Sequence, residues 1–230
     1  MIAFLGAMDI EVDGIKKMMT DTETTQFGPY TYFKGKLHGK EIVVAKCGIG
    51  KVSSGSCTTA LIQLFSPSLI VNTGVAGGLL KGIGMKKGDI VIADKTVHHD
   101  ADATALGYAL GQVPDQPLYF ECDPKAAERL IHTAKETLNV QVFSGTIASG
   151  DAFVSSEELS AKIRDTFGAA ACEMEGASIG QVCTACSVPY CVIRAISDCA
   201  DDDASMDYPT FEKLAAARAI ELVSTFVKTY

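Results

Sequence analysis

Short apolar segments that run into glycine-rich or acidic loops recur along this chain, and this pattern restricts the fold more than any other feature. Residues 2–5 lead into Gly6, residues 69–72 lead into a segment with three glycines, and residues 141–148 lead into Ser-Gly-Asp. Buried strands that alternate with helices are typical of α/β folds, in which ligands bind beyond the carboxyl ends of the strands. The sequence therefore predicts an α/β protein whose functional residues lie in loops that follow strands.

The periodicity of apolar residues predicts the individual elements. Strands are expected at residues 2–5, 30–35, 36–37, 41–46, 69–72, 88–93, 141–148, 167–172 and 189–198, and helices at residues 10–19, 53–65, 124–138, 157–167, 177–186 and 208–230. Ser155 and Glu158 fit a capping box for the fourth helix, and Leu214 is expected to face inward from the last one. Residues 94–122 show no regular pattern, and so long a connection is usually functional or packed on another subunit.

Composition and charge exclude several classes of protein. At 230 residues and 47% hydrophobic content the chain is long enough for one well-filled domain, and no change in composition divides residues 1–230. The net charge of −8, without a Lys/Arg run, argues against a nucleic-acid partner. No apolar run approaches the roughly 18 residues of a membrane helix, and Met1 is not followed by an export signal. We therefore expect a soluble cytoplasmic protein that does not bind membranes, with its eight cysteines reduced.

Two clusters invite a metal-site hypothesis, and neither is complete. Cys183 and Cys186 have the spacing of a zinc or redox pair, but no second pair or nearby histidine accompanies them. His99 and Asp100 stand together in the irregular connection, where packing against a second subunit, which would bury Leu106, is the favoured interpretation. We expect neither a metal nor a cofactor.

The segment Glu173-Met174-Glu175 separates a run of small apolar residues from a helical pattern, so we expect it in a strand-to-helix turn. One interpretation is that a carboxylate there accepts both hydroxyls of a sugar diol while the methionine packs on the apolar face of the sugar. The other is that both glutamates stabilise the N-terminus of the following helix. Arg194, in an apolar strand, needs a buried anionic partner, which Glu11 or Glu175 could supply.

Taken together, the residues at the strand ends resemble a known family over nearly the whole chain. The motifs that carry the resemblance, in chain order, are Gly6-Ala7-Met8-x-x-Glu11, Gly48-Ile49-Gly50-Lys51-Val52, Asn72-Thr73-Gly74-x-Ala76-Gly77-Gly78, His99-Asp100-Ala101-Asp102, Ser149-Gly150-Asp151-Ala152-Phe153, Glu173-Met174-Glu175 and Arg194-Ala195-Ile196-Ser197-Asp198. In this order they resemble the 5'-methylthioadenosine/S-adenosylhomocysteine nucleosidases of the nucleoside phosphorylase superfamily. Several motifs in the family's order are far more specific than any one of them.

The resemblance implies a fold, an assembly and a reaction. The implied fold is a three-layer α/β/α arrangement with a central mixed, partly barrel-like sheet, and the implied assembly is a homodimer. The implied reaction is irreversible hydrolysis of the N-glycosidic bond to adenine, in the nucleosides that methionine salvage recycles. By this similarity Asp198 is the general acid at adenine N7, and Glu11 is the base that orients the attacking water with help from Arg194. Glu175 would accept the ribose hydroxyls.

The resemblance also implies the remaining substrate contacts. They are Met174 under the ribose, Phe153 stacked on adenine, the backbone of Val154 at the base edge, Gly77 and Ser197 in the same site, and Met8, Ile49 and Tyr208 around the 5'-alkylthio group, together with Leu106 of the partner subunit and Pro114 of the partner subunit. The preference among methylthioadenosine, S-adenosylhomocysteine, 5'-deoxyadenosine and aminofutalosine-type substrates depends on the shape of the 5' pocket and stays open.

The chain departs from the family pattern at two positions. Many relatives carry a serine where this chain has Val75, and commonly a phenylalanine where it has Leu106. Val75 removes a hydroxyl near the attacking water, which changes how that water is held. Leu106 shortens an apolar wall, which affects the ranking of 5' substituents.

Two other functions compete with hydrolysis. A purine nucleoside phosphorylase of the same fold would bind phosphate through arginines and backbone amides, but the first loop here carries Glu11, and no arginine precedes Arg129. A nucleoside-binding protein without catalysis is the second alternative. The presence of Glu11, Glu175, Arg194 and Asp198 together favours the enzyme.

Overall fold

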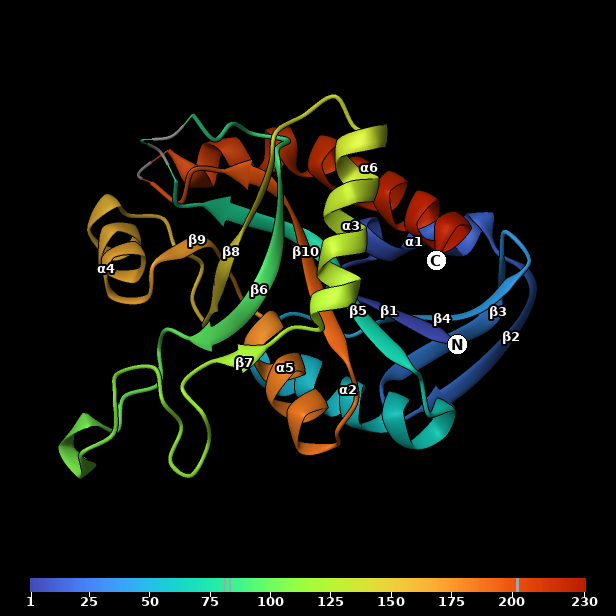
Figure 1. The fold of residues 1–230 in the computed structure, drawn as a ribbon, viewed down its shortest axis with the longest axis horizontal. Coiled ribbons are helices and arrows are strands. Elements are labelled where there is room, and N and C mark those ends of the chain that lie inside the picture. The colour runs from blue at the N-terminus through green and yellow to red at the C-terminus, as the bar shows by residue number, and fades with distance from the viewer. Residues whose placement is uncertain (81, 83, 202) are drawn as a thin grey trace.

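The structure is a computed structural model that describes residues 1–80, 82, 84–201 and 203–230. Within these residues ten strands form one mixed sheet, shown in Figure 1. Their bounds are β1 Ile2–Gly6, β2 Thr20–Phe27, β3 Tyr30–Leu37, β4 Lys40–Lys46, β5 Leu69–Gly78, β6 Ile90–His98, β7 Phe120–Glu121, β8 Val142–Ser149, β9 Ala169–Glu173 and β10 Tyr190–Asp198.

Five of these strands close into a barrel. The order β10-β6-β8-β9-β5 returns to its start because β10 pairs with both β6 and β5. The β10–β5 and β8–β9 pairs are parallel, whereas β10–β6 and β5–β9 are antiparallel. The sheet then continues from β5 through β1, β4 and β3 to β2, which is its outer edge. The predicted mixed and partly barrel-like sheet is therefore confirmed.

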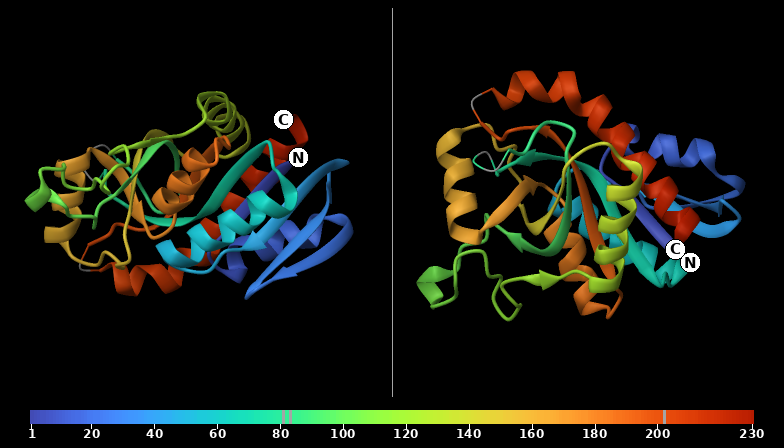
Figure 2. Two further views of the ribbon diagram at one scale, coloured as in Figure 1. Left: turned by 90° about the horizontal axis from the view of Figure 1, so that it is seen from below. Right: turned by 45° about the horizontal axis from the view of Figure 1, so that its top comes forward.

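Helices cover the sheet from both sides. Their bounds are α1 Asp9–Met18, α2 Lys51–Phe65, α3 Pro124–Thr137, α4 Glu157–Phe167, α5 Gly176–Ala185 and α6 Ala204–Thr229. α1 and α6 pack on each other, and so do α2 and α5. The right-hand view of Figure 2 shows α6 along one side of the sheet and α5 on the opposite side. The predicted three-layer α/β/α arrangement is confirmed.

The buried core fills the space between sheet and helices. Phe4, Ile70 and Ile193 of the central strands are fully buried, as are Leu222 and Phe226 of α6. Among the residues that the structure describes, no helix is both long and apolar enough to cross a membrane. Six of the eight cysteines are buried.

Two strands extend further than the sequence predicted. The glycine-rich segment after Asn72 was expected to be a loop, but β5 runs through it to Gly78. It remains a strand because Gly77 pairs with Asp198 of β10 and with Cys172 of β9. β6 likewise extends to His98, so the irregular connection is shorter than predicted.

β2 was not predicted at all. Its sequence, TDTETTQF, has no apolar face, and seven of its eight residues are exposed. The strand forms because it pairs with β3, and this pairing satisfies its backbone groups whatever its side chains are. An edge strand of this kind gives no hydrophobic signal in the sequence.

Three smaller predictions about the helices were wrong: the cap of α4, the start of α6 and the direction of Leu214. The cap of α4 is Ser156 rather than Ser155, since the Leu159 N–H donates to Ser156 Oγ over 3.3 Å. α6 begins at Ala204, before the predicted start, and Leu214 is 45% exposed on its outer face. The sequence Asp201-Asp202-Asp203 is most simply a solvated loop, but Asp202 lies outside the described residues.

Gly180 and Gly55 both lie inside helices, yet they should respond to alanine in opposite ways. A Cβ atom at Gly180 would lie 2.5 Å from Tyr190 Oη and 2.9 Å from Thr96 Oγ1, so Gly180→Ala should lower the free energy of unfolding by about 1–3 kcal/mol. At Gly55 the nearest atom is Val182 Cγ2 at 3.7 Å, so Gly55→Ala should raise it by up to about 1 kcal/mol through helix propensity. Urea unfolding at one protein concentration measures both changes. Equal shifts in the two variants would contradict the packing argument.

Candidate active site

A cavity of about 430 Å³ lies where β5, β9 and β10 end and α1, α5 and α6 begin. Most of the residues that the sequence analysis assigned to a nucleoside site line it. These are Met8, Glu11, Ile49, Gly77, Phe153, Val154, Met174, Glu175, Ser197, Asp198 and Tyr208. Arg194 and Leu106 are not part of its wall, and Ala7, Ala152 and Ser205, which were not predicted, are.

Glu11 is held rigidly in the first turn of α1. Its Oε2 accepts hydrogen bonds from the Ala7 N–H at 2.6 Å and the Met8 N–H at 3.0 Å, and its Oε1 accepts one from the Val75 N–H at 3.1 Å. Burial raises the pKa of Glu11, and the Arg194 charge and these N–H donors oppose that rise. Glu11 thus stabilises the helix start and also faces the cavity.

Close backbone approach makes room for this carboxylate. A Cβ atom at Gly74 would lie 2.5 Å from Glu11 Oε1 and 3.3 Å from Arg194 Nη1. Only a glycine therefore fits between the glutamate and the guanidinium. The close approach of these two side chains explains why β5 has a glycine at position 74, in a segment that was predicted to be a loop.

Arg194 lies behind the cavity wall and is 1% exposed. Its Nη2 donates to Glu173 Oε2 and, over 2.6 Å, to Asn72 Oδ1, while Nη1 donates to the Ile193 carbonyl at 3.1 Å. Glu175, one of the two partners that the sequence analysis named, lies 3.6 Å away. The directly hydrogen-bonded partner is Glu173, to which that analysis had given no role beyond helix stabilisation. A buried arginine requires a carboxylate, but no local feature of the sequence distinguishes Glu173 from Glu175 as the direct partner.

Glu173 also organises the turn between β9 and α5. It accepts hydrogen bonds from Ser149 Oγ, from the Glu175 N–H at 3.1 Å and from the Gly176 N–H at 2.8 and 3.0 Å. The helix-stabilising interpretation is therefore correct for Glu173. These hydrogen bonds to Glu173 fix the backbone that carries Met174 and Glu175 into the cavity.

Glu175 is 6% exposed and has fewer donors than Glu11. Its Oε1 accepts a hydrogen bond from the Gly50 N–H at 2.9 Å. Burial and then the nearby Glu173 charge raise the pKa of Glu175 to about 8, and Arg194 only partly opposes this. A hydroxyl donor placed in the cavity would favour its ionised form.

Asp198 ends β10 on another wall of the cavity. Its Oδ2 accepts a hydrogen bond from Ser197 Oγ at 2.8 Å, and its Oδ1 accepts one from the Ala200 N–H at 2.9 Å. A Cβ atom at Gly77 would lie 3.0 Å from Asp198 Oδ1 and 2.8 Å from the Ala200 Cβ, so a glycine is required there. The irregular register of β10 with β5 occurs at this point and turns the aspartate inward.

Aromatic and thioether groups form the apolar part of the cavity. The rings of Phe153 and Tyr208 meet edge to face at 5.6 Å, and Tyr208 Oη donates to Met8 Sδ over 3.2 Å. Phe153 is 48% exposed and Ile49 is 56% exposed. The cavity is therefore open on its aromatic side and closed on its acidic side.

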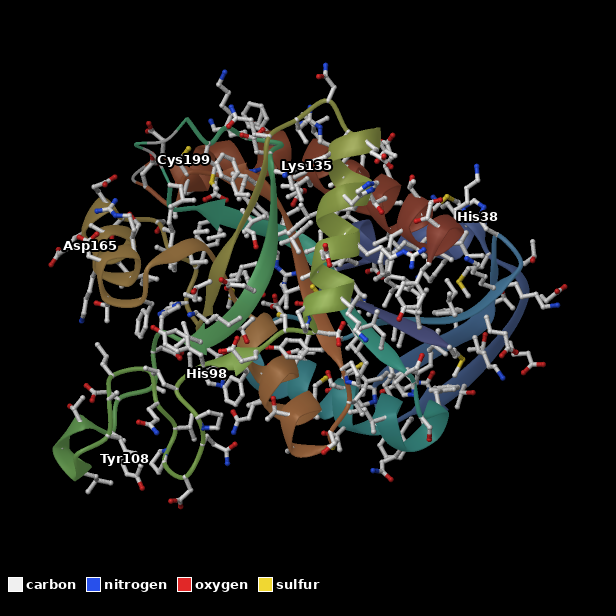
Figure 3. All side chains as sticks on the ribbon, in the orientation of Figure 1. His38, His98, Tyr108, Lys135, Asp165 and Cys199 are labelled. Carbon is white, nitrogen blue, oxygen red and sulfur yellow. The ribbon has the colours of Figure 1, made fainter. Side chains whose placement is uncertain are left out.

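Leu106 lies far from the cavity of its own chain, on the connection between β6 and β7, and is 75% exposed. Figure 3 shows Tyr108, in the same connection, at the outer end of a projecting loop. His99 and Asp100 at the start of this connection belong to no metal site. Across the described residues, no group of three or more His, Cys, Asp or Glu side chains is arranged to hold a metal ion.

The cavity thus combines an apolar part with carboxyl groups, and three of these groups other than Glu173 come from separate elements. Glu11 comes from α1, Glu175 from the start of α5 and Asp198 from the end of β10. Paired carboxyl groups on different walls can divide the roles of acid and base in the cleavage of a glycosidic bond. Phe153 and Met174, which both line the cavity, suit contact with a flat ring joined to a sugar.

Comparison with known proteins agrees with this chemistry. Residues 1–228 match the family model of the phosphorylase superfamily. The 5'-methylthioadenosine/S-adenosylhomocysteine nucleosidase of Haemophilus influenzae (strain PittEE) is 44% identical over 223 residues, which cover 96% of each chain. The nucleosidase of the same name from Staphylococcus saprophyticus is 42% identical over 233 residues and covers 100% of each chain.

The solved structures give the same result. The crystal structure of the Neisseria meningitidis nucleosidase in complex with methylthio-immucillin-A superposes with a TM-score of 0.96 at 41% sequence identity, covering 100% of this chain and 99% of that one. Identity at this level over the full length shows common descent as well as a common fold. The chain therefore belongs to the phosphorylase superfamily and, within it, to the family of the 5'-methylthioadenosine/S-adenosylhomocysteine nucleosidases.

Proposed function

We propose that this protein hydrolyses the N-glycosidic bond of 5'-methylthioadenosine and S-adenosylhomocysteine, and also of 5'-deoxyadenosine, and releases adenine and the free sugar. Relatives that cover the full length of the chain carry the name of this activity. The observation that supports hydrolysis over phosphorolysis is the charge of the cavity. None of the described residues that line the cavity is Lys, Arg or His. Four of them, Glu11, Glu173, Glu175 and Asp198, carry carboxyl groups. Such a wall repels phosphate and accepts water.

In the mechanism that we propose, Asp198 protonates adenine N7 as the glycosidic bond breaks, because adenine leaves slowly as an anion. Glu11 orients a water molecule and takes its proton as the sugar gains oxocarbenium character. Arg194 supports this step indirectly, since it opposes the pKa rise of Glu11 from behind the wall. Glu175 accepts hydrogen bonds from the ribose hydroxyls. These hydroxyls supply the hydrogen-bond donors that its buried carboxylate lacks.

We propose the remaining contacts from their places in the cavity. Phe153 and the backbone of Val154 would hold adenine, with Gly77 and Ser197 beside Asp198. Met174 would lie under the ribose. Met8, Ile49 and Tyr208 would surround the 5'-alkylthio group, since Tyr208 Oη already meets Met8 Sδ.

We further propose that residues 1–230 act as one domain and that two copies associate in the cytoplasm. Strands from both halves of the chain, β5 and β10, pair within one barrel, which supports a single folding unit. The exposed Leu106 and the open side of the cavity at Ile49 support a dimer in which Leu106 of the partner subunit covers the 5' end of the substrate. Six buried cysteines that form no disulfide agree with a reducing compartment. The reaction would serve methionine salvage.

Adenine release from 5'-methylthioadenosine, with and without phosphate, tests this function first. We expect equal rates under both conditions and free methylthioribose as the sugar product, identified by its mass. The physical reason is the acidic wall, which leaves no site for the phosphate anion. Methylthioribose 1-phosphate that forms only when phosphate is present would instead establish a phosphorylase.

Removal of either proposed catalytic carboxyl group should nearly abolish turnover. We expect Glu11→Gln and Asp198→Asn each to lower kcat by about 10²–10⁴-fold, the usual contribution of general acid–base catalysis. Asp9→Asn is the matched control, because Asp9 lies in the same helix turn and pairs with Lys46 at the surface. Circular dichroism should show all three variants folded. An Asp198→Asn variant that keeps most of its activity would refute the role at N7.

The raised pKa of Glu175, about 8, predicts how substrate binding depends on pH. The empty site favours the protonated carboxyl group, whereas the ribose diol donates to the ionised one, so binding releases a proton. The affinity for an uncleavable analogue with both hydroxyls should therefore rise with pH, by up to about tenfold per unit, until the pH reaches the pKa of the free site. Calorimetry in buffers of different ionisation enthalpy measures the released proton. If Glu175→Gln kept the same pH dependence, another group would be responsible.

A further inference from the structure

Three charged residues outside the cavity wall join two of the loops that build it to the connection between β6 and β7. Lys51 Nζ lies 2.5 Å from Asp100 Oδ1, and Asp100 Oδ2 accepts a hydrogen bond from the Asp151 N–H at 2.9 Å. The circuit closes because Asp151 Oδ1 accepts a hydrogen bond from the Lys51 N–H at 2.8 Å. We name Lys51, Asp100 and Asp151 the loop bridge.

The loop bridge is built more firmly than the other surface ion pairs. The side chains of Lys51 and Asp100 are 22% and 30% exposed, whereas those of the Lys36–Asp21 pair are 49% and 68% exposed. Burial would raise the pKa of Asp100, but the hydrogen bonds from Lys51 and the Asp151 N–H outweigh it and lower the pKa. A partly buried carboxylate with two such donors contributes more than an exposed pair.

Two of the three loops lead directly to a group in the cavity. Lys51 follows Gly50, whose N–H donates to Glu175 Oε1 at 2.9 Å. Asp151 precedes the Phe153 segment by two residues. The Gly50 backbone also lies close to Asp151, since a Cβ atom at Gly50 would be 2.9 Å from Asp151 Oδ1.

The third loop is the projecting connection between β6 and β7. Asp100 lies at its start, just after His98, which Figure 3 labels at the end of β6. The His99 N–H donates to the Ser149 carbonyl at 2.9 Å, so this end of the connection is also tied to the exit of β8. A displacement of the connection would therefore be transmitted to residues 149–154 through Asp100.

We infer that the loop bridge positions two substrate-binding groups of this site, the Glu175 carboxylate through the Gly50 N–H and the Phe153 ring through residues 151–153, without touching the substrate. This inference rests on the proposed function, because it assigns the bridge to nucleoside binding. Lys51, Asp100 and Asp151 are thus positioning residues. Their loss loosens the ribose and adenine contacts and leaves Glu11 and Asp198, on α1 and β10, in place.

A double-mutant cycle measures this role kinetically. We expect Lys51→Met and Asp100→Asn each to raise the KM for 5'-methylthioadenosine roughly tenfold, the effect of losing one charge-assisted hydrogen bond, with kcat changed far less. The double variant should be no worse than either single variant, because each one already opens the circuit. Lys51→Arg keeps the charge and should restore most of the wild-type KM. Lys36→Met and Asp21→Asn, at the remote β2–β3 pair, are the matched controls and should leave KM unchanged.

Hydrogen exchange of the ligand-free protein tests the bridge without any activity. Asp100→Asn should speed amide exchange in peptides that cover residues 47–53 and 149–155, where the bridge fixes the N–H groups, and leave residues 30–46 unchanged. Unchanged exchange in the first two segments, unchanged KM in the single variants, or multiplied effects in the double variant would each overturn the inference. A wild-type protein that does not cleave the nucleoside would reject the proposed function instead, and the exchange experiment would still decide the bridge.

Discussion

The buried contact between Arg194 and Glu173 is the interaction on which the site depends. A guanidinium that is 1% exposed requires an anion and acceptors around it, and three strands supply them: Asn72 from within β5, Glu173 from the end of β9 and the Ile193 carbonyl from within β10. Removing one partner of such a pair typically costs about 3–5 kcal/mol, because the remaining charge is left uncompensated. The ends of β5, β9 and β10 are therefore fixed relative to one another, and the groups that face the cavity inherit their positions from this contact.

Closure of the barrel explains why so many glycines are needed at that point. β5 and β9 run antiparallel and overlap only where Gly77 and Gly78 meet Cys172 and Ala171, so their ends converge instead of diverging. Converging strands leave no room for side chains where carboxyl groups turn inward. A Cβ atom at Gly77 would lie 3.0 Å from Asp198 Oδ1, which shows how tightly the backbone encloses that carboxylate. The glycines thus belong to the strand because the acids occupy the space beside it.

This dependence also shows how far the sequence could predict the molecule. Alternation of apolar runs with helical patterns sufficed for most elements, and residues at strand ends such as Glu11 and Asp198 do share one cavity. β2 could not be predicted, because backbone pairing with β3 holds it and its side chains carry no pattern. The direct partner of Arg194 was missed for a related reason. Which carboxylate meets the guanidinium is set by the registers of β9 and β10 against β5, and no local spacing in the chain encodes a register between strands that are distant in sequence.

The surplus of carboxyl groups over cations has a consequence for catalysis. Glu11, Glu173, Glu175 and Asp198 line a cavity behind which Arg194 is the counter-charge, and burial raises the pKa of both Glu11 and Glu175. Carboxylates close together in a low dielectric repel one another, so ionisation of the empty site is unfavourable. This repulsion lowers the stability of the folded protein. A ribosyl group that gains positive charge as its bond to adenine breaks relieves this repulsion, whereas the neutral substrate does not. In the mechanism that we propose, the acidic wall therefore binds the transition state more strongly than the ground state, and only such a difference in binding accelerates the reaction.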